Sequence, residues 1–145
     1  MTTVANNGII SCEGRVLVVD DEAPVRKPIC VSLRKAGYEV IEAEDGEQAI
    51  RALNSGDNSL LVDTILCDIR MPNINGVDAI TYFRRQYPSV PVVVLTGYPD
   101  VELAVSLMKM GVSDYLVKPV AKDHLLKIIK RSAGHHTLFK DQFVA

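Results

Sequence analysis

Thr64-Ile65-Leu66-Cys67-Asp68-Ile69-Arg70-Met71-Pro72 carries the strongest signal of the fold in this chain. A short apolar run, rich in residues that favour strands, ends in a single carboxylate, and a Met-Pro turn follows. Apolar runs of this length are typical of buried strands. An open α/β sheet binds its ligands beyond the carboxyl ends of its strands, so Asp68 is predicted to lie at a functional edge.

Strand and helix patterns alternate along the rest of the chain. The other strand patterns cover residues 16–19, 38–43, 92–95 and 114–117. Helical patterns begin near Pro24, Asp45 and Asn75, and two more cover about 100–110 and 121–133. Such alternation with short loops produces right-handed βαβ units and a parallel sheet covered on both faces. We therefore predict an α/β fold, a flavodoxin-like (βα)5 three-layer sandwich with five parallel strands in the order 2-1-3-4-5.

The composition is that of an ordinary globular domain, with 145 residues, 48% of them hydrophobic, and a net charge of −2. Near-neutral charge, few aromatic residues and no Trp argue against direct binding to nucleic acid. Cys12, Cys30 and Cys67 form no disulfide or zinc pattern, and Cys30 and Cys67, in apolar runs, are expected to be buried free thiols. No signal peptide or membrane span is visible, so a cytoplasmic protein without membrane contact is expected.

Polar side chains stand at four of the predicted strand ends. They are Asp20, Asp21 and Glu22 after the first strand, Asp68 after the third, Thr96 after the fourth and Lys118 after the fifth. Because parallel strands open on one edge of the sheet, these residues are expected to converge. Carboxylate oxygens suit a hard cation such as Mg²⁺, and a hydroxyl and an ammonium beside it suit a phosphoryl group. A carboxylate is then left to accept that group covalently.

This set of residues resembles the receiver domain of two-component response regulators over residues 15–133. The matching pieces are Val18-Val19-Asp20-Asp21-Glu22, Cys67-Asp68-Ile69-Arg70-Met71-Pro72, Gly76, Leu95-Thr96-Gly97-Tyr98 and Asp114-Tyr115-Leu116-Val117-Lys118-Pro119. The resemblance implies that Asp68 accepts a phosphoryl group from a sensor histidine kinase or a histidine phosphotransfer protein. It also implies Mg²⁺ as cofactor, bound by Asp21, Asp68 and the backbone carbonyl of Arg70, with Asp20 acting through water.

The same resemblance implies how the phosphoryl group would be held and sensed. Lys118 would pair with it, Thr96 and Tyr115 would act as switch residues, and the Lys118-Pro119 peptide would be cis. The surface of the helix 100–110, the strand 114–117 and the last helix would then change. A downstream output domain or protein, or a phosphorylation-dependent homodimer, would respond to that surface.

Two residues beside the predicted pocket are expected to set the lifetime of the signal. Arg70 and Tyr98 are bulky and would hinder in-line attack by water, whereas Gly97 would leave the pocket open to donors. The chain would lose only its own phosphoryl group and is not expected to be an enzyme that turns over an external substrate.

The chain divides into three predicted segments. Residues 1–14 are expected to be a flexible leader, residues 15–133 the receiver domain, and residues 134–145 a C-terminal tail or a linker to an absent output domain.

The sequence alone leaves three other functions open. A receiver that takes no phosphate would act as a protein-interaction module, although the intact acids and Lys118 argue against it. An aspartate-nucleophile phosphatase of the haloacid dehalogenase type would carry Asp-x-Asp on its first strand, where this chain has adjacent acids. A flavodoxin-like FMN carrier would need a hydroxyl- and Gly-rich phosphate loop in place of Asp20-Asp21-Glu22.

Overall fold

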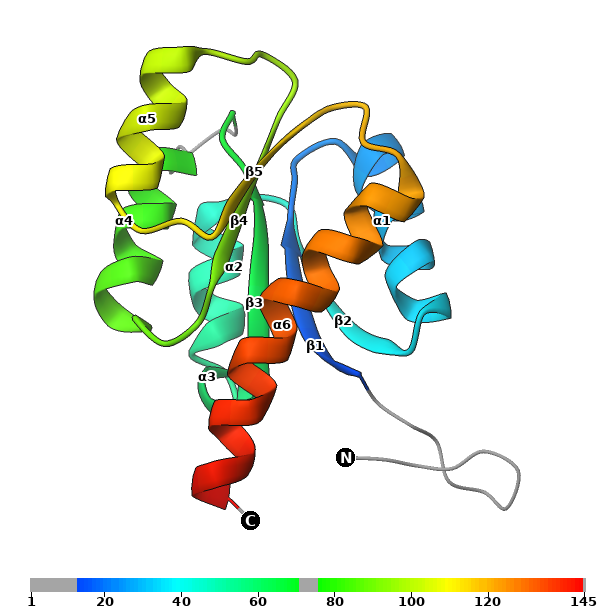
Figure 1. Ribbon diagram of the computed structural model, residues 1–145, viewed down its shortest axis with the longest axis vertical. Coiled ribbons are helices and arrows are strands. Elements are labelled where there is room, and N and C mark those ends of the chain that lie inside the picture. The colour runs from blue at the N-terminus through cyan, green and yellow to red at the C-terminus, as the bar shows by residue number, and fades with distance from the viewer. Residues whose placement is uncertain (1–12, 71–75, 145) are drawn as a thin grey trace.

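One parallel sheet organises the molecule (Figure 1). The computed structural model describes residues 13–70 and 76–144, with side chains as far as residue 134. The strands are β1 (Gly14–Val19), β2 (Tyr38–Ala43), β3 (Val62–Asp68), β4 (Val92–Thr96) and β5 (Asp114–Val117). Their order is β2-β1-β3-β4-β5, and every pairing is parallel, which confirms the predicted α/β fold and strand order.

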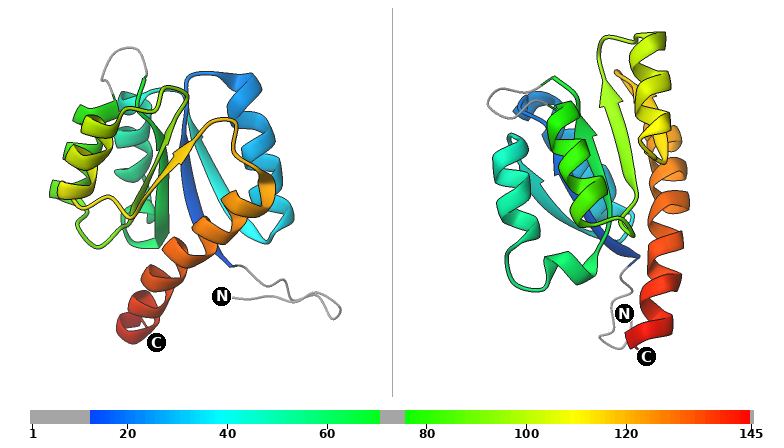
Figure 2. Two further views of the ribbon diagram at one scale, coloured as in Figure 1. Left: turned by 45° about the horizontal axis from the view of Figure 1, so that its top comes forward. Right: turned by 90° about the vertical axis from the view of Figure 1, so that its left-hand side faces the viewer.

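Helices cover both faces of the sheet (Figure 2). They are α1 (Ala23–Lys35), α2 (Gly46–Leu53), α3 (Asn58–Leu61), α4 (Gly76–Gln86), α5 (Val101–Lys109) and α6 (Lys122–Val144). The cluster on one face joins Leu17 of β1 to Phe83 of α4, and the cluster on the other joins Val16 of β1 to Ile129 of α6. Adjacent residues of β1 thus feed opposite clusters, because successive side chains of a strand point to opposite faces.

The central strand β3 is buried along its whole length, as expected for a parallel sheet covered on both sides. Its last residue, Asp68, is therefore delivered from a rigid element to the edge of the sheet. Cys30 and Cys67 are free and buried, as predicted, while Cys12 lies outside the described residues. Neither α6 nor another helix within the described residues has an apolar stretch long enough to cross a membrane.

The structure differs from the sequence-based expectation at three places along the chain. The predicted leader extends one residue too far, because Gly14 already pairs with Tyr38 of β2, and residues 1–12 lie outside the described part. The sequence predicts no helix directly before β3, where the structure contains the single-turn helix α3. The last helix, expected over 121–133, begins at Lys122 and continues to Val144. No Pro follows Pro119, and one Gly in a helix costs only about 1 kcal/mol, so nothing in this sequence stops α6 earlier.

Candidate functional site

The carboxyl ends of four strands bring the predicted site residues together. Asp68 ends β3 and Thr96 ends β4, while Asp20 and Lys118 come directly after β1 and β5. Asp20 is completely buried and Asp68 is 3% exposed. The parallel topology therefore assembles one site from segments that are far apart in the sequence.

Lys118 is the cation at the centre of this site. Its Nζ lies 2.9 Å from Oδ2 of Asp20, 3.3 Å from Oδ2 of Asp68 and 3.6 Å from Oε1 of Glu22. Burial would lower the pKa of Lys118, but its close ionic contact with Asp20 and the charges of Asp68 and Asp20 outweigh burial and raise that pKa. Lys118 is therefore charged at neutral pH and holds two buried carboxylates together.

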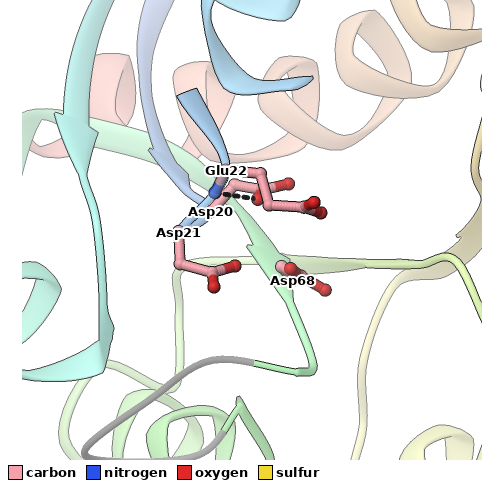
Figure 3. A group of neighbouring side chains, drawn as sticks. All are labelled: Asp20, Asp21, Glu22 and Asp68. Carbon is pink, nitrogen blue, oxygen red and sulfur yellow. Dashed lines mark hydrogen bonds between the residues drawn. The ribbon is translucent and has the colours of Figure 1, made fainter. Parts of the chain in front are cut away.

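Four acidic side chains converge at this edge of the sheet (Figure 3). Asp20, Asp21, Glu22 and Asp68 each place a carboxylate oxygen within 4.8 Å of the others. Buried Oδ2 of Asp20 is ion-paired with Lys118 but accepts no well-formed hydrogen bond from the described residues. This all-oxygen donor set with a partly unsatisfied buried oxygen fits a hard divalent cation such as Mg²⁺.

Glu22 also belongs to this cluster, although the sequence predicts no separate role for it. It directly follows the two acids predicted to bind the metal, and its backbone N–H donates to Oδ1 of Asp20 over 2.9 Å. The signal was present in the run of three acids, which already suggested a cation. The position of the Glu22 carboxylate depends on the geometry of the turn into α1.

The Asp68 carboxyl has an unusual environment for an acid. Burial, followed by the negative charge of Asp20, raises its pKa from 3.8 to about 6, against the opposing effects of Lys118 and of the Arg70 backbone N–H. That N–H lies 3.2 Å from Oδ1 of Asp68. A carboxyl with this pKa is still mostly ionised at neutral pH, so Asp68 is available as a nucleophile.

An open cavity of about 460 Å³ leads to Asp68. It is lined by Asp21, Glu22, Asp68, Arg70, Gly97, Tyr98 and Lys118. On its rim, Cζ of Arg70 lies 4.1 Å from the centroid of the Tyr98 ring. A Cβ on Gly97 would make ordinary contact with Lys118, 3.8 Å from its Cδ, so the absence of a side chain there leaves room beside the lysine.

Gly76 holds the end of β3 against the start of α4. Its backbone N–H donates to the carbonyl of Ile69 over 2.8 Å. A Cβ at this position would lie 2.4 Å from Cα of Ile69 and 2.5 Å from the carbonyl oxygen of Asp68. Only glycine permits such a close approach, so Gly76 helps to define where Asp68 stands. Asn75, near which this helix is predicted to begin, lies outside the described residues.

Thr96 and Tyr115, the predicted switch residues, contact backbone groups and are not among the cavity-lining residues. The Thr96 hydroxyl accepts a hydrogen bond from the Tyr98 backbone N–H over 3.0 Å, and the whole Thr96 residue is 1% exposed. The Tyr115 hydroxyl accepts from the backbone N–H of Asp100 over 3.4 Å, next to the start of α5. The Lys118-Pro119 peptide bond is cis.

Comparisons with known proteins give one consistent result. A family model described as the response regulator receiver domain matches residues 16–130. The chain is 33% identical to the DNA-binding transcriptional regulator NtrC of Proteus hauseri over 124 residues, which cover 86% of this chain and 25% of that protein. It is also 33% identical to the transcriptional regulatory protein ZraR of Escherichia coli K12, covering 83% of this chain and 26% of that protein. This chain thus spans about a quarter of the length of these relatives.

Solved structures agree with the curated relatives. The chemotaxis protein CheY4 of Vibrio cholerae is similar with a TM-score of 0.75 and 31% identity, over 82% of this chain and 98% of that one. A response regulator receiver protein from Pseudomonas putida is similar with a TM-score of 0.76 and 31% identity, over 84% and 99% of the two chains.

Proposed function

Since this chain belongs to the response regulator receiver family, we propose that Asp68 accepts a phosphoryl group from a histidine kinase or a histidine phosphotransfer protein in a Mg²⁺-dependent reaction. One observation carries the proposal. The Lys118 ammonium lies 3.3 Å from the Asp68 carboxylate at the floor of an open cavity, beside a cluster of acids. This arrangement offers a nucleophile together with the positive charge that a phosphoryl group requires.

The acids around Asp68 have separate tasks in this proposal. Asp21, Asp68 and the backbone carbonyl of Arg70 would hold Mg²⁺, and Asp20 would act through water. Bound Mg²⁺ supplies positive charge to the phosphoryl oxygens. An Asp68 oxygen attacks phosphorus, the bond from phosphorus to the donor nitrogen breaks, and the donor imidazole keeps that electron pair. Lys118 then exchanges its contact with the Asp68 carboxylate for a phosphoryl oxygen.

Phosphorylation is proposed to move Thr96 and Tyr115, whose hydroxyl groups accept hydrogen bonds from backbone N–H groups in this structure. The Thr96 hydroxyl would leave the Tyr98 N–H for a phosphoryl oxygen, and Tyr115 would leave Asp100 and move inward. Both contacts are hydrogen bonds between uncharged groups, so each costs only about 1 kcal/mol to break. The phosphoryl group adds about two negative charges next to Lys118, which outweighs such contacts.

The output surface is proposed to comprise α5, β5 and α6. Helix α5 is weakly anchored, because Leu107 is its only buried residue. Its exposed apolar side chains include Val101, 80% exposed, together with Val105 and Met108. A helix with little buried area shifts readily between two positions. A downstream output domain or protein, or a second phosphorylated copy of the chain, would bind the phosphorylated form.

Intact mass measurement tests the proposal directly. Incubating the chain with Mg²⁺ and acetyl phosphate is expected to add a single phosphoryl group, which EDTA abolishes. The adduct should be absent in Asp68→Asn and present in Asp78→Asn, a matched control on the exposed side of α4. No adduct on the parent chain, or an undiminished adduct on Asp68→Asn, would contradict the proposal.

A further inference from the structure

Arg26 of α1 is a buried cation directly behind the acid cluster. The residue is only 4% exposed, although arginine is rarely buried without specific partners. Its Nη1 donates to the backbone carbonyl of Asp20 over 2.7 Å, and its Nε donates to Oε1 of Glu42 over 2.9 Å. The planar guanidinium therefore bridges the acidic turn and strand β2.

The turn that carries the acids is held at three points. The backbone N–H of Asp20 donates to the carbonyl of Ala43 in β2 over 3.1 Å. Oδ1 of Asp20 accepts from the backbone N–H of Glu22 over 2.9 Å. The third point is the Asp20 carbonyl, which belongs to the peptide unit leading into Asp21 and is held by Arg26. Asp21 itself is exposed, so the orientation of this peptide determines where its carboxylate points.

We infer that Arg26 is a positioning residue for the metal-binding acids: anchored by Glu42, it holds the Asp20–Asp21 peptide in the orientation that Mg²⁺ binding needs. This inference rests on the proposed function, because it concerns the same Mg²⁺ site. Arg26 would not touch the metal or the phosphoryl group. It acts through the Asp20 carbonyl, in the way that second-sphere partners orient metal ligands.

The anchor is a carboxylate that stays charged. Burial raises the pKa of Glu42, but hydrogen bonds from Arg26 and Lys27, followed by the Lys27 charge and an Arg34 hydrogen bond, lower that pKa to about 2. Lys27 Nζ lies 2.9 Å and Arg34 Nη2 lies 3.4 Å from the Glu42 carboxylate. Arg26, Lys27 and Arg34 thus share the Glu42 carboxylate. Arg26 also donates a hydrogen bond to the Asp20 carbonyl.

Positioning and simple charge effects predict opposite results at Arg26. Removing a positive charge close to an acidic site strengthens cation binding if only Coulomb interaction matters. Removing a positioning contact weakens it, typically 10- to 100-fold for partners of metal ligands. Arg34→Gln is the matched control, since it removes the same charge and a contact with the same Glu42 but leaves the Asp20 carbonyl held.

Isothermal titration of the full chain with MgCl₂, well below the unfolding temperature, tests the inference. Arg26→Gln is expected to bind Mg²⁺ about 10-fold more weakly than the parent, and Arg34→Gln as tightly or slightly more tightly. Arg26→Lys keeps the charge but cannot reach both partners, so a smaller loss is expected. Glu42→Gln should also lose less Mg²⁺ affinity than Arg26→Gln, because the Arg26 contact with the Asp20 carbonyl remains.

A second readout separates positioning from a purely structural role. The initial rate of phosphorylation of Arg26→Gln by acetyl phosphate should recover toward the parent rate as Mg²⁺ approaches saturation, because only metal affinity is impaired. Equal Mg²⁺ affinity of Arg26→Gln and Arg34→Gln would overturn the inference and leave the proposed function standing. If Arg26→Gln does not fold, the same comparison is decided by Arg26→Lys. A parent chain that binds no Mg²⁺ would overturn the proposed function and this inference together.

Discussion

The guanidinium of Arg70 lies over the ring of Tyr98, with Cζ 4.1 Å from the ring centroid. The two residues follow different strands, and both line the cavity that opens onto Asp68. A cation–π contact of this kind contributes about 0.5–1 kcal/mol at an exposed site. The pair therefore forms an ordered rim that a phosphodonor can displace at little cost.

Removing either partner of this rim is expected to shorten the life of the phosphoryl group. Arg70→Ala and Tyr98→Ala should each lose phosphate several-fold faster than the parent, because water gains an open in-line approach to phosphorus. Tyr98→Phe keeps the ring and should lose phosphate at nearly the parent rate. The decay of phosphorylated chain, followed by intact mass after removal of acetyl phosphate, measures this. Slower decay in the alanine variants would show that the rim does not shield the site.

Asp68→Asn is expected to stabilise the metal-free protein at neutral pH. The pKa of Asp68 rises from 3.8 to about 6 on folding, so the folded state binds this proton more tightly than the unfolded state. The parent therefore loses about 1–3 kcal/mol of stability as the pH rises from below 4 to above 6. The Asp68→Asn variant has no ionisable group at this position, so it does not lose stability over this pH range for the same reason.

Urea unfolding in EDTA across this pH range measures the effect. Asp68→Asn should be more stable than the parent at about pH 7.5 and nearly equal to it at about pH 4. Adding Mg²⁺ should raise the stability of the parent by mass action and that of the variant much less. A stability difference independent of pH would mean that Asp68 ionises normally in the folded chain.

Glu42→Gln is expected to show the opposite pH dependence. The pKa of Glu42 falls from 4.5 to about 2 on folding, so ionised Glu42 stabilises the folded state above pH 4.5. The variant should be less stable than the parent by about 1–3 kcal/mol at pH 7. That deficit should shrink as the pH falls from 4.5 toward 2. A deficit that stays constant down to pH 3 would argue against the ionic contacts of Glu42 as its cause.

Gly76→Ala is expected to destabilise the protein by about 2–3 kcal/mol, because the added methyl group would overlap the backbone of Asp68 and Ile69. Gly134→Ala is the control, since a Cβ at Gly134 meets nothing within 4 Å and α6 continues through it. Alanine there should stabilise the helix by about 0.5–1 kcal/mol. Denaturant midpoints of the two variants give the comparison. A neutral Gly76→Ala would mean that α4 shifts freely relative to β3.

Hydrogen exchange is expected to identify α5 as the first helix to respond to phosphorylation. Its amides should exchange faster than those of α1, because α5 buries only Leu107 whereas α1 buries four residues. Phosphorylation of Asp68 should alter exchange in α5 and β5 and leave α1 nearly unchanged. An unchanged α5 would contradict the proposed output surface.

Much of the site could be predicted because it lies at strand ends. Asp68, Thr96 and Lys118 each follow an apolar run, and a parallel sheet brings all such positions to one edge. Arg26 carried no comparable signal. Its partner Glu42 lies on β2, and the two meet only because β2 pairs with β1. Such contacts between elements depend on side-chain geometry that periodicity does not encode.

Local sequence patterns are enough to predict the alternation of strands and helices, and with it the parallel sheet and the identity of the residues at its edge. These follow from local properties: apolar runs, turn residues and the spacing of acids. How those residues interact depends on the folded structure. It placed Lys118 between Asp20 and Asp68, stacked Arg70 on Tyr98 and buried Arg26 behind the acids. Distances of a few ångströms set these interactions, and only the packing of the whole chain determines them.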